Sequence, residues 1–179
     1  MEDKRQHIAS KPDYFNLLNL PVSFQVDVKN LERHYHLLQQ QIHPDRFAQA
    51  SESERRVAVQ YSSLINDAYD TLKQPLKRAL YLLQYYGGDD INFDRDTVND
   101  YDFLTEQMAL RQQLAENINL AELERKVNVH LKLLYTKLHA LFAQTTIDTK
   151  TIKNDIIKLH FFDKLKREIH HQKNHSGEL

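Results

Sequence analysis

The alternation of apolar and polar positions predicts helices along nearly the whole chain. In the first half, two stretches place apolar residues three or four positions apart, as one face of an α-helix requires. We expect the first helix over residues 27–42, with the face Leu31, Tyr35, Leu38 and Ile42. The second should carry the face Val57, Tyr61, Leu64, Ala68 and Leu72. Two facing stripes of similar length predict an antiparallel helical hairpin.

Signals for helix ends place a loop at the tip of this hairpin. Asp27 is a good N-cap for the first helix. Pro44 disfavours helical geometry at His43, so the first helix should stop there. Ser51 and Glu54 form a capping-box pattern at the start of the second helix. The segment between these signals should therefore be exposed at the hairpin tip.

Two shorter helices and a glycine pair complete the first half. We expect one helix over residues 13–18 and another from Pro75 through Tyr86, because proline favours the first position of a helix. Gly87 and Gly88 mark the best domain boundary. The expected division is a first domain at 1–86, a linker at 87–96 and a second domain at 97–179.

The second half contains no proline and predicts a small bundle. Three helices are expected, at about 97–116, 120–142 and 149–171, with Asn119 and Asp148 as caps. The middle helix should bury the face Leu123, Val127, Leu131, Leu134, Leu138 and Leu141. Three antiparallel helices joined by short turns make a three-helix bundle. The predicted fold class is thus all-α.

Composition removes most catalytic and cofactor chemistry. The chain has no cysteine, which excludes disulfides, thiolate zinc sites and cysteine ligation of an iron–sulfur cluster by this chain. Three glycines are too few for a dinucleotide fingerprint or a P-loop. Among ten histidines, His34 and His36 would point apart on a helix. We therefore predict no enzyme activity, no cofactor and no metal site.

Charge and hydropathy argue against nucleic-acid and membrane partners. The net charge is −1, and no polybasic tract is present. Apolar runs are too short to span a bilayer, and the first residues lack the apolar stretch of a signal peptide. The expected compartment is the cytoplasm. A helical DNA-binding module remains a rival interpretation, weakened by the absence of a basic recognition helix.

Several motifs in order give the chain a family resemblance. The hairpin tip reads QIHPDRF, preceded by DYFNLLNLP and followed by INDAYDTL and QPLKRALYLL. This order resembles the J-domain. In the second half, FLTEQMALRQQLAE and LHFFDKLKREI resemble the C-terminal domain of the HscB family of bacterial iron–sulfur assembly. The resemblance implies an L-shaped protein with an N-terminal J-domain, whose hairpin carries the HPD loop, and a C-terminal three-helix bundle.

The resemblance also implies two protein partners and a chaperone-binding site. A member of this family stimulates the ATPase of a DnaK/HscA-type chaperone and delivers an IscU-type iron–sulfur scaffold protein to it. The implied chaperone-binding residues are Arg33, His43, Pro44, Asp45 and Arg46. Glutamines at positions 39–41 stand where basic residues are usual, so we expect a weaker and less salt-sensitive encounter.

The implied scaffold-binding surface lies on the first and last helices of the second domain. Its residues are Leu104, Thr105, Met108, Ala109, Gln112, Glu116 and Phe161. On a helical wheel, Leu104 and Met108 lie beside a core arc formed by Phe103, Leu110, Leu114 and Ile118. Phe161 points away from Ile152, which favours an exposed apolar anchor. The alternative is a last helix buried on two sides.

The family's polar rim is only partly present. The family pattern carries methionine at position 105 and acids at positions 109 and 112, where this chain has Thr105, Ala109 and Gln112. These differences put the strength of scaffold binding in doubt more than its location. A J-domain co-chaperone that serves other client proteins is therefore a second alternative.

Overall fold

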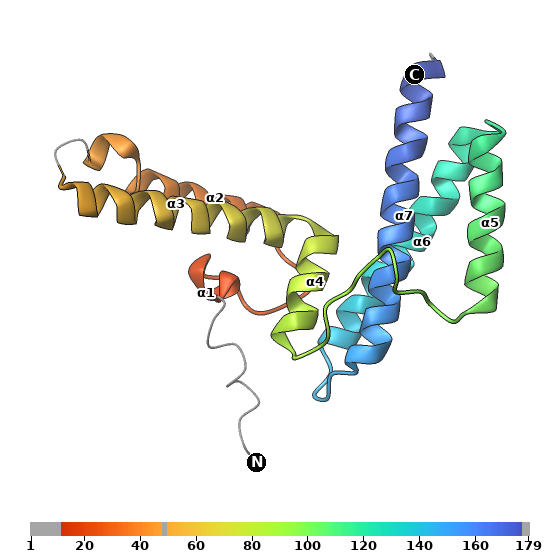
Figure 1. Ribbon diagram of the computed structural model, residues 1–179, viewed down its shortest axis with the longest axis horizontal. Helices are drawn as coiled ribbons and strands as arrows, with labels where there is room; N and C mark the ends of the chain where they lie inside the picture. Colours follow the sequence, from red (N-terminus) through yellow and green to blue (C-terminus); the bar gives the residue numbers. More distant parts are fainter. Residues whose placement is uncertain (1–11, 48–49, 177–179) are drawn as a thin grey trace. The chain divides into compact units, whose positions relative to one another are not determined.

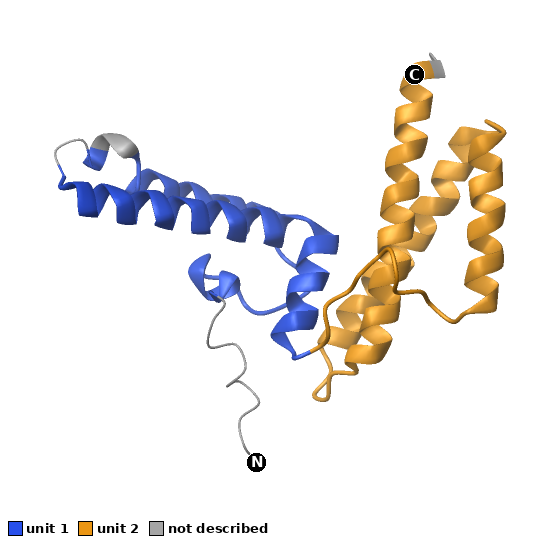
Figure 2. Ribbon diagram, viewed as in Figure 1, with its two compact units in different colours: residues 1–87 blue, residues 88–179 orange. Residues whose placement is uncertain are grey.

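The described part of the protein is all-α. The computed structural model describes residues 12–47 and 50–176, apart from the side chains of Pro44, Asp45 and Ser176. Within these residues every regular element is helical (Figure 1), which confirms the predicted fold class. The chain divides into two compact units, residues 1–87 and 88–179 (Figure 2).

The first unit is built around a helical hairpin. Helices α2 (Val28–Gln41) and α3 (Glu52–Lys73) run antiparallel, and the short 3-10 helix η2 (Pro44–Phe47) lies at their turn (Figure 1). Helices α1 (Tyr14–Leu17) and α4 (Pro75–Tyr85) complete the unit. The predicted hairpin and its caps are confirmed, since Asp27 accepts two backbone hydrogen bonds and Ser51 and Glu54 form a capping box.

A ladder of side-chain contacts fixes the register of the hairpin. Asn66 Oδ1 accepts hydrogen bonds from Tyr35 Oη at 3.0 Å and from Gln39 Nε2 at 2.6 Å. The rings of Tyr35 and Tyr69 stack with centroids 4.1 Å apart. Nearer the base, Lys73 pairs with Glu32 at 3.2 Å. These pairs place the end of α2 opposite the middle of α3, so the first turns of α3 extend past it.

This overhang explains why the predicted apolar face of α3 is partly wrong. Leu31, Ala68 and Leu72 are buried as expected. Val57, however, is 61% exposed, and Tyr61 is also exposed. The buried positions near them are Ala58 and Ile65. The first turns of α3 pack against η2 instead of α2, and Ala58 lies on that packed side while Val57 does not. Helical periodicity alone could not identify this change of neighbour.

The second unit contains three helices. They are α5 (Tyr101–Ala115), α6 (Leu120–Phe142) and α7 (Thr149–Ser176). The prediction for α6 is confirmed at both ends. Helix α5 begins later than expected because Asp100 accepts the hydrogen bond from Phe103 N–H and is the N-cap. Helix α7 continues five residues beyond the predicted end at His171.

The core of the second unit follows the predicted face of α6 closely. Leu123, Val127, Leu131, Leu134 and Leu138 are all buried. The last predicted position is wrong: residue 141 is only half-buried, and residue 142 is buried in its place. The predicted core residue at position 118 is exposed because it follows the end of α5, in the turn to α6.

Candidate partner-binding surfaces

The tip of the hairpin carries the predicted chaperone-binding loop. The His43 side chain is exposed, and its backbone carbonyl accepts a hydrogen bond from Arg46 N–H at 2.9 Å. Arg46 is exposed as well. The side chains of Pro44 and Asp45 lie outside the described residues. Pro44 and Asp45 begin the 3-10 helix η2, which follows α2 after Ile42 and His43.

The exposed side of α2 is polar but carries little charge. Arg33 is exposed and donates a hydrogen bond to Asn30 Oδ1 at 2.6 Å. Leu37, one turn further on, is 51% exposed, and Gln40 follows on the same side. Sequence analysis did not single out Leu37, although its spacing of four from Arg33 and three from Gln40 could have done so. Lys29, one turn before Arg33, is also exposed, so this side carries two cations and one apolar residue.

Six of the seven predicted scaffold-binding residues are exposed on α5 or at its end. Leu104 is 40% and Met108 75% exposed, which makes an apolar pair one helical turn apart. The polar or small members of the set are Thr105, Ala109, Gln112 and Glu116. Two of these side chains are hydrogen-bonded to each other: Gln112 Nε2 donates to Glu116 Oε1 at 2.8 Å. We call this surface the α5 face.

The seventh residue, Phe161, is not on the surface. It is only 5% exposed and packs edge-on against Phe103, with centroids 5.7 Å apart, and against Phe162 at 5.1 Å. The guanidinium of Arg111 lies 5.3 Å from its centroid. The expected exposed anchor is therefore wrong, and the alternative of a helix buried on two sides holds at this position. Packing against α5 covers the ring.

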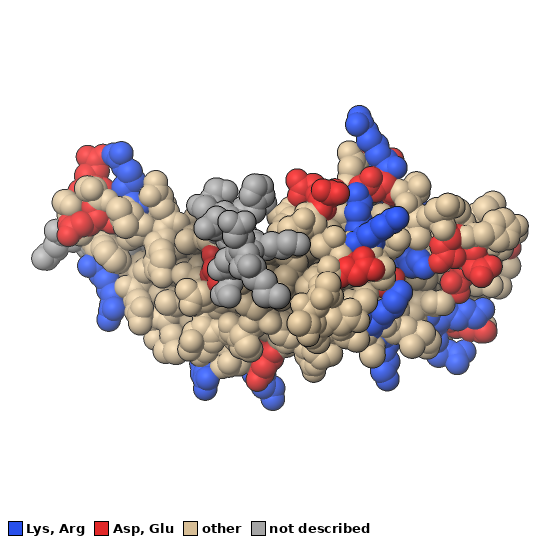
Figure 3. Space-filling view, turned by 90° about the horizontal axis from the view of Figure 1, so that it is seen from below, with Lys and Arg blue, Asp and Glu red and all other residues tan. Residues whose placement is uncertain are grey.

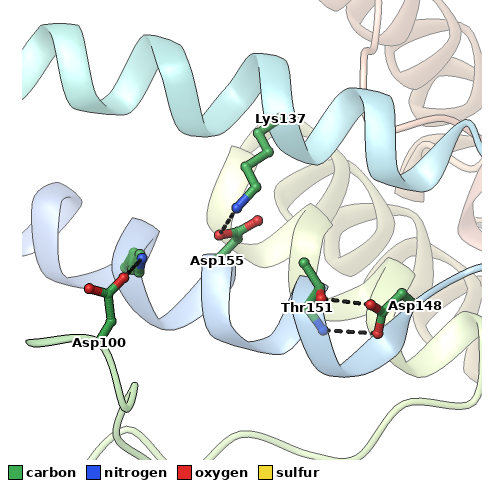
Figure 4. Close-up of polar contacts among 6 residues, drawn as sticks. Asp100, Lys137, Asp148, Thr151 and Asp155 are labelled. Carbon is green, nitrogen blue, oxygen red and sulfur yellow. Dashed lines mark hydrogen bonds and ion pairs between the residues drawn. The ribbon is translucent and has the colours of Figure 1, made fainter. Parts of the chain in front are cut away.

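Ion pairs connect the start of α5 to α7. Asp100, labelled in Figure 4, combines the N-cap bond with a hydrogen bond from Lys158 Nζ at 2.5 Å. These two contacts, with Lys158 the larger cause, lower the pKa of the Asp100 carboxyl. The carboxylate holds α5 against α7 and stabilises the position of the α5 face.

A second ion pair in Figure 4 joins α6 to α7. Lys137 Nζ lies 2.8 Å from Oδ1 of Asp155, a buried carboxylate. Because a buried charge is costly without a partner, this pair contributes to the packing of the two long helices. The supporting helices of the α5 face are thus joined by specific contacts.

Other classes of site find little support in the described residues. They contain no group of three or more histidine or acidic side chains arranged to hold a metal ion. Among them, no helix combines the length and apolar character needed to cross a bilayer. On the face in Figure 3, Lys and Arg are interspersed with Asp and Glu. A nucleic-acid interface would require a continuous basic surface.

Comparisons with known proteins agree with both halves of this description. Residues 13–81 match the DnaJ domain, and residues 99–170 match the HscB C-terminal oligomerisation domain. The co-chaperone protein HscB homolog of Shewanella denitrificans is 38% identical over 88% of this chain and 94% of its own. The co-chaperone protein HscB of Proteus mirabilis is 37% identical over 89% of this chain and 94% of its own.

Solved structures give the same result. The chaperone HscB from Vibrio cholerae superposes with a TM-score of 0.80 at 36% identity, covering 92% of this chain and 99% of its own. The human co-chaperone protein HscB superposes with a TM-score of 0.84 at 33% identity, covering 97% of this chain and 92% of its own. The resemblance found in the sequence is confirmed, and the chain belongs to the HscB family of J-domain co-chaperones.

Proposed function

We propose that this protein stimulates ATP hydrolysis by a DnaK/HscA-type chaperone and delivers an IscU-type iron–sulfur scaffold protein to it. Family membership together with a J-domain implies a chaperone of this class as a partner. The observation that carries the proposal is the separation of two exposed surfaces. The tip around His43 belongs to one compact unit, and the α5 face belongs to the other.

The tip supplies the contact with the chaperone. An exposed histidine, the carboxylate of Asp45 and the cation of Arg46 can make charge-assisted hydrogen bonds to a partner. Pro44 restricts the backbone and lowers the entropic cost of docking. Arg33 and Leu37 on α2 extend the contact surface. The protein acts by shifting a conformational equilibrium of the chaperone, whose own site hydrolyses ATP.

The α5 face supplies the contact with the scaffold protein. Leu104 and Met108 offer apolar area that binding would remove from water, and exposed polar residues surround them. Phe161 supports this face from beneath instead of contacting the scaffold, because its ring packs under Arg111 and against Phe103. The iron–sulfur cluster remains cargo of the scaffold, since this chain has no cysteine to ligate it.

The ATPase rate of the chaperone tests this function directly. It should be measured with chaperone alone, with this protein added, and with this protein and the cognate scaffold together. We expect stimulation by this protein and a further, more than additive increase with the scaffold. Stimulation that is indifferent to the scaffold would indicate a J-domain co-chaperone for other clients. No stimulation at all would contradict the proposal.

A further inference from the structure

An open groove lies beside the α5 face in the second unit. It has a volume of about 1360 Å³ and is bounded by α5, α7 and the segment 91–94. Its apolar lining includes Leu114, Ile91 and Phe93. The ring of Phe93 stacks on His160 with centroids 3.8 Å apart, which holds the segment against α7. We call it the α5–α7 groove.

Cations outnumber carboxylates around this groove. The lining contains Arg111, Lys164 and Arg167, against Asp94 and Glu168. The pairs that would neutralise the cations are long or solvent-exposed: Arg111 lies 3.8 Å from Glu168, and the exposed Arg167 pairs with the half-buried Asp163 at 3.2 Å. Such pairs contribute little attraction in water and leave the cations able to bind other anions.

Lys164 is the cation best placed to accept a new partner. It is exposed, and no carboxylate pairs with it within the described part of the chain. The pKa of His160, which also lines the groove, is lowered. Burial is the main cause that lowers this pKa. The charges of Lys164 and Arg167 lower it further, and those of Asp163 and Asp94 oppose them without reversing the shift. The neutral form of this ring is therefore favoured.

The groove continues the α5 face. Arg111 follows Met108 by three positions and Leu104 by seven, so all three lie on one side of α5. Ala115, which also lines the groove, follows Met108 by seven. A protein segment lying on Leu104 and Met108 would thus enter the groove without changing direction.

We infer that the α5–α7 groove binds an acidic segment of the scaffold protein, with its carboxylates on Arg111, Lys164 and Arg167. This inference rests on the proposed scaffold-binding function and adds the chemistry of the partner. Carboxylates suit this rim because arginine and lysine both donate charge-assisted hydrogen bonds to them. A basic segment would be repelled.

Charge reversal in the full-length protein tests the inference. The variant is Lys164→Glu with Arg167→Glu, and its matched control is Arg125→Glu with Lys132→Glu, two exposed cations of α6 outside the groove. Both variants change the net charge equally. Affinity for the cognate scaffold protein is measured by titration calorimetry, and circular dichroism checks that each variant folds. Lys164→Gln with Arg167→Gln provides a milder second variant.

We expect the groove reversal to weaken scaffold binding about tenfold and the control to change it less than about twofold. The neutral variant should also reduce the dependence of the affinity on salt. If the scaffold binds the wild-type protein and the groove and control variants behave alike, the groove inference is overturned while the scaffold-binding function stands. If the scaffold does not bind the wild-type protein, both are overturned.

Discussion

At the scale of single residues, the α5 face depends on two exposed apolar side chains. Met108 is 75% exposed, and Leu104 lies one turn before it on the same side of α5. Exposed apolar residues adjacent to each other and surrounded by polar ones are typical of protein-binding sites. The sequence could predict this pair because helical spacing separates it from the core arc that begins at Phe103.

Truncation of this pair should weaken scaffold binding with little effect on folding. We expect Leu104→Ala with Met108→Ala to raise the dissociation constant at least tenfold, since truncated hot-spot residues typically cost about 2 kcal/mol or more. Leu133→Ala is the matched control, because Leu133 is an exposed apolar residue of α6. Titration calorimetry with the scaffold protein measures both. Equal losses in the two variants would exclude the α5 face as a specific site.

Phe161 shows where prediction from residues fails. A helical wheel correctly places Phe161 opposite Ile152 on α7. It cannot show whether another helix covers the side that carries Phe161. In the structure that side is covered, and Phe161 contacts Phe103 and Arg111. Only the packing of α5 on α7, a contact between segments about fifty residues apart, determines its burial.

Replacement of Phe161 should therefore reduce stability first. We expect Phe161→Ala to lower the free energy of unfolding by about 3–5 kcal/mol, the usual cost of truncating a buried phenylalanine. Denaturant unfolding followed by circular dichroism measures this. Met108→Ala serves as the exposed comparison and should change it by less than about 0.5 kcal/mol. A Phe161→Ala variant of unchanged stability would contradict the buried position.

At the scale of elements, capping residues were more predictable than the packed side of α3. The caps at Asp27, Ser51 and Asn119 depend on hydrogen bonds within a few residues, so local sequence is sufficient to identify them. The packed side of α3 depends on how far α2 extends beside it. Val57 and Tyr61 were assigned to the core because periodicity contains no information about that length.

Helix α2 should give the chaperone encounter a shallow salt dependence. Its exposed side carries Lys29 and Arg33 in its first half, but Gln40 and Gln41 stand at its end, where further cations would strengthen long-range attraction. We expect the affinity for the chaperone to fall less than about threefold between roughly 50 and 200 mM salt. Gln40→Lys with Gln41→Lys should steepen this dependence. A steep fall for the wild-type protein would contradict the prediction.

Helix α7 should contain a histidine that resists protonation. Burial against Phe93, together with the charges of Lys164 and Arg167, outweighs the opposing charges of Asp163 and Asp94 and lowers the pKa of His160 below its usual value. The unfolded chain therefore binds a proton first as pH falls, so this residue reduces stability below about pH 6.5.

Nuclear magnetic resonance titration of the His160 ring measures this pKa. The Lys164→Gln variant removes a positive charge and should raise the pKa of His160. If the pKa of His160 were at or above the ordinary histidine value, or were lowered further by this substitution, the proposed environment of the groove would be wrong.

At the scale of the whole molecule, the proposed function requires that two surfaces act separately. The hairpin tip and the α5 face belong to different compact units, and each unit has its own buried core. The order of motifs in the sequence was sufficient to identify the family, because it extends through both halves. The groove beside α5 could not be identified in this way, since it combines the segment 91–94 with α5 and α7.

The most direct test measures chaperone ATPase rates with and without the scaffold for the wild-type protein and two variants. His43→Gln should abolish stimulation while its scaffold affinity, measured separately, stays unchanged. Leu104→Ala with Met108→Ala should retain stimulation by the protein alone and lose the additional increase with scaffold. If either folded variant lost both activities to the same extent, the account of two separate surfaces would be contradicted.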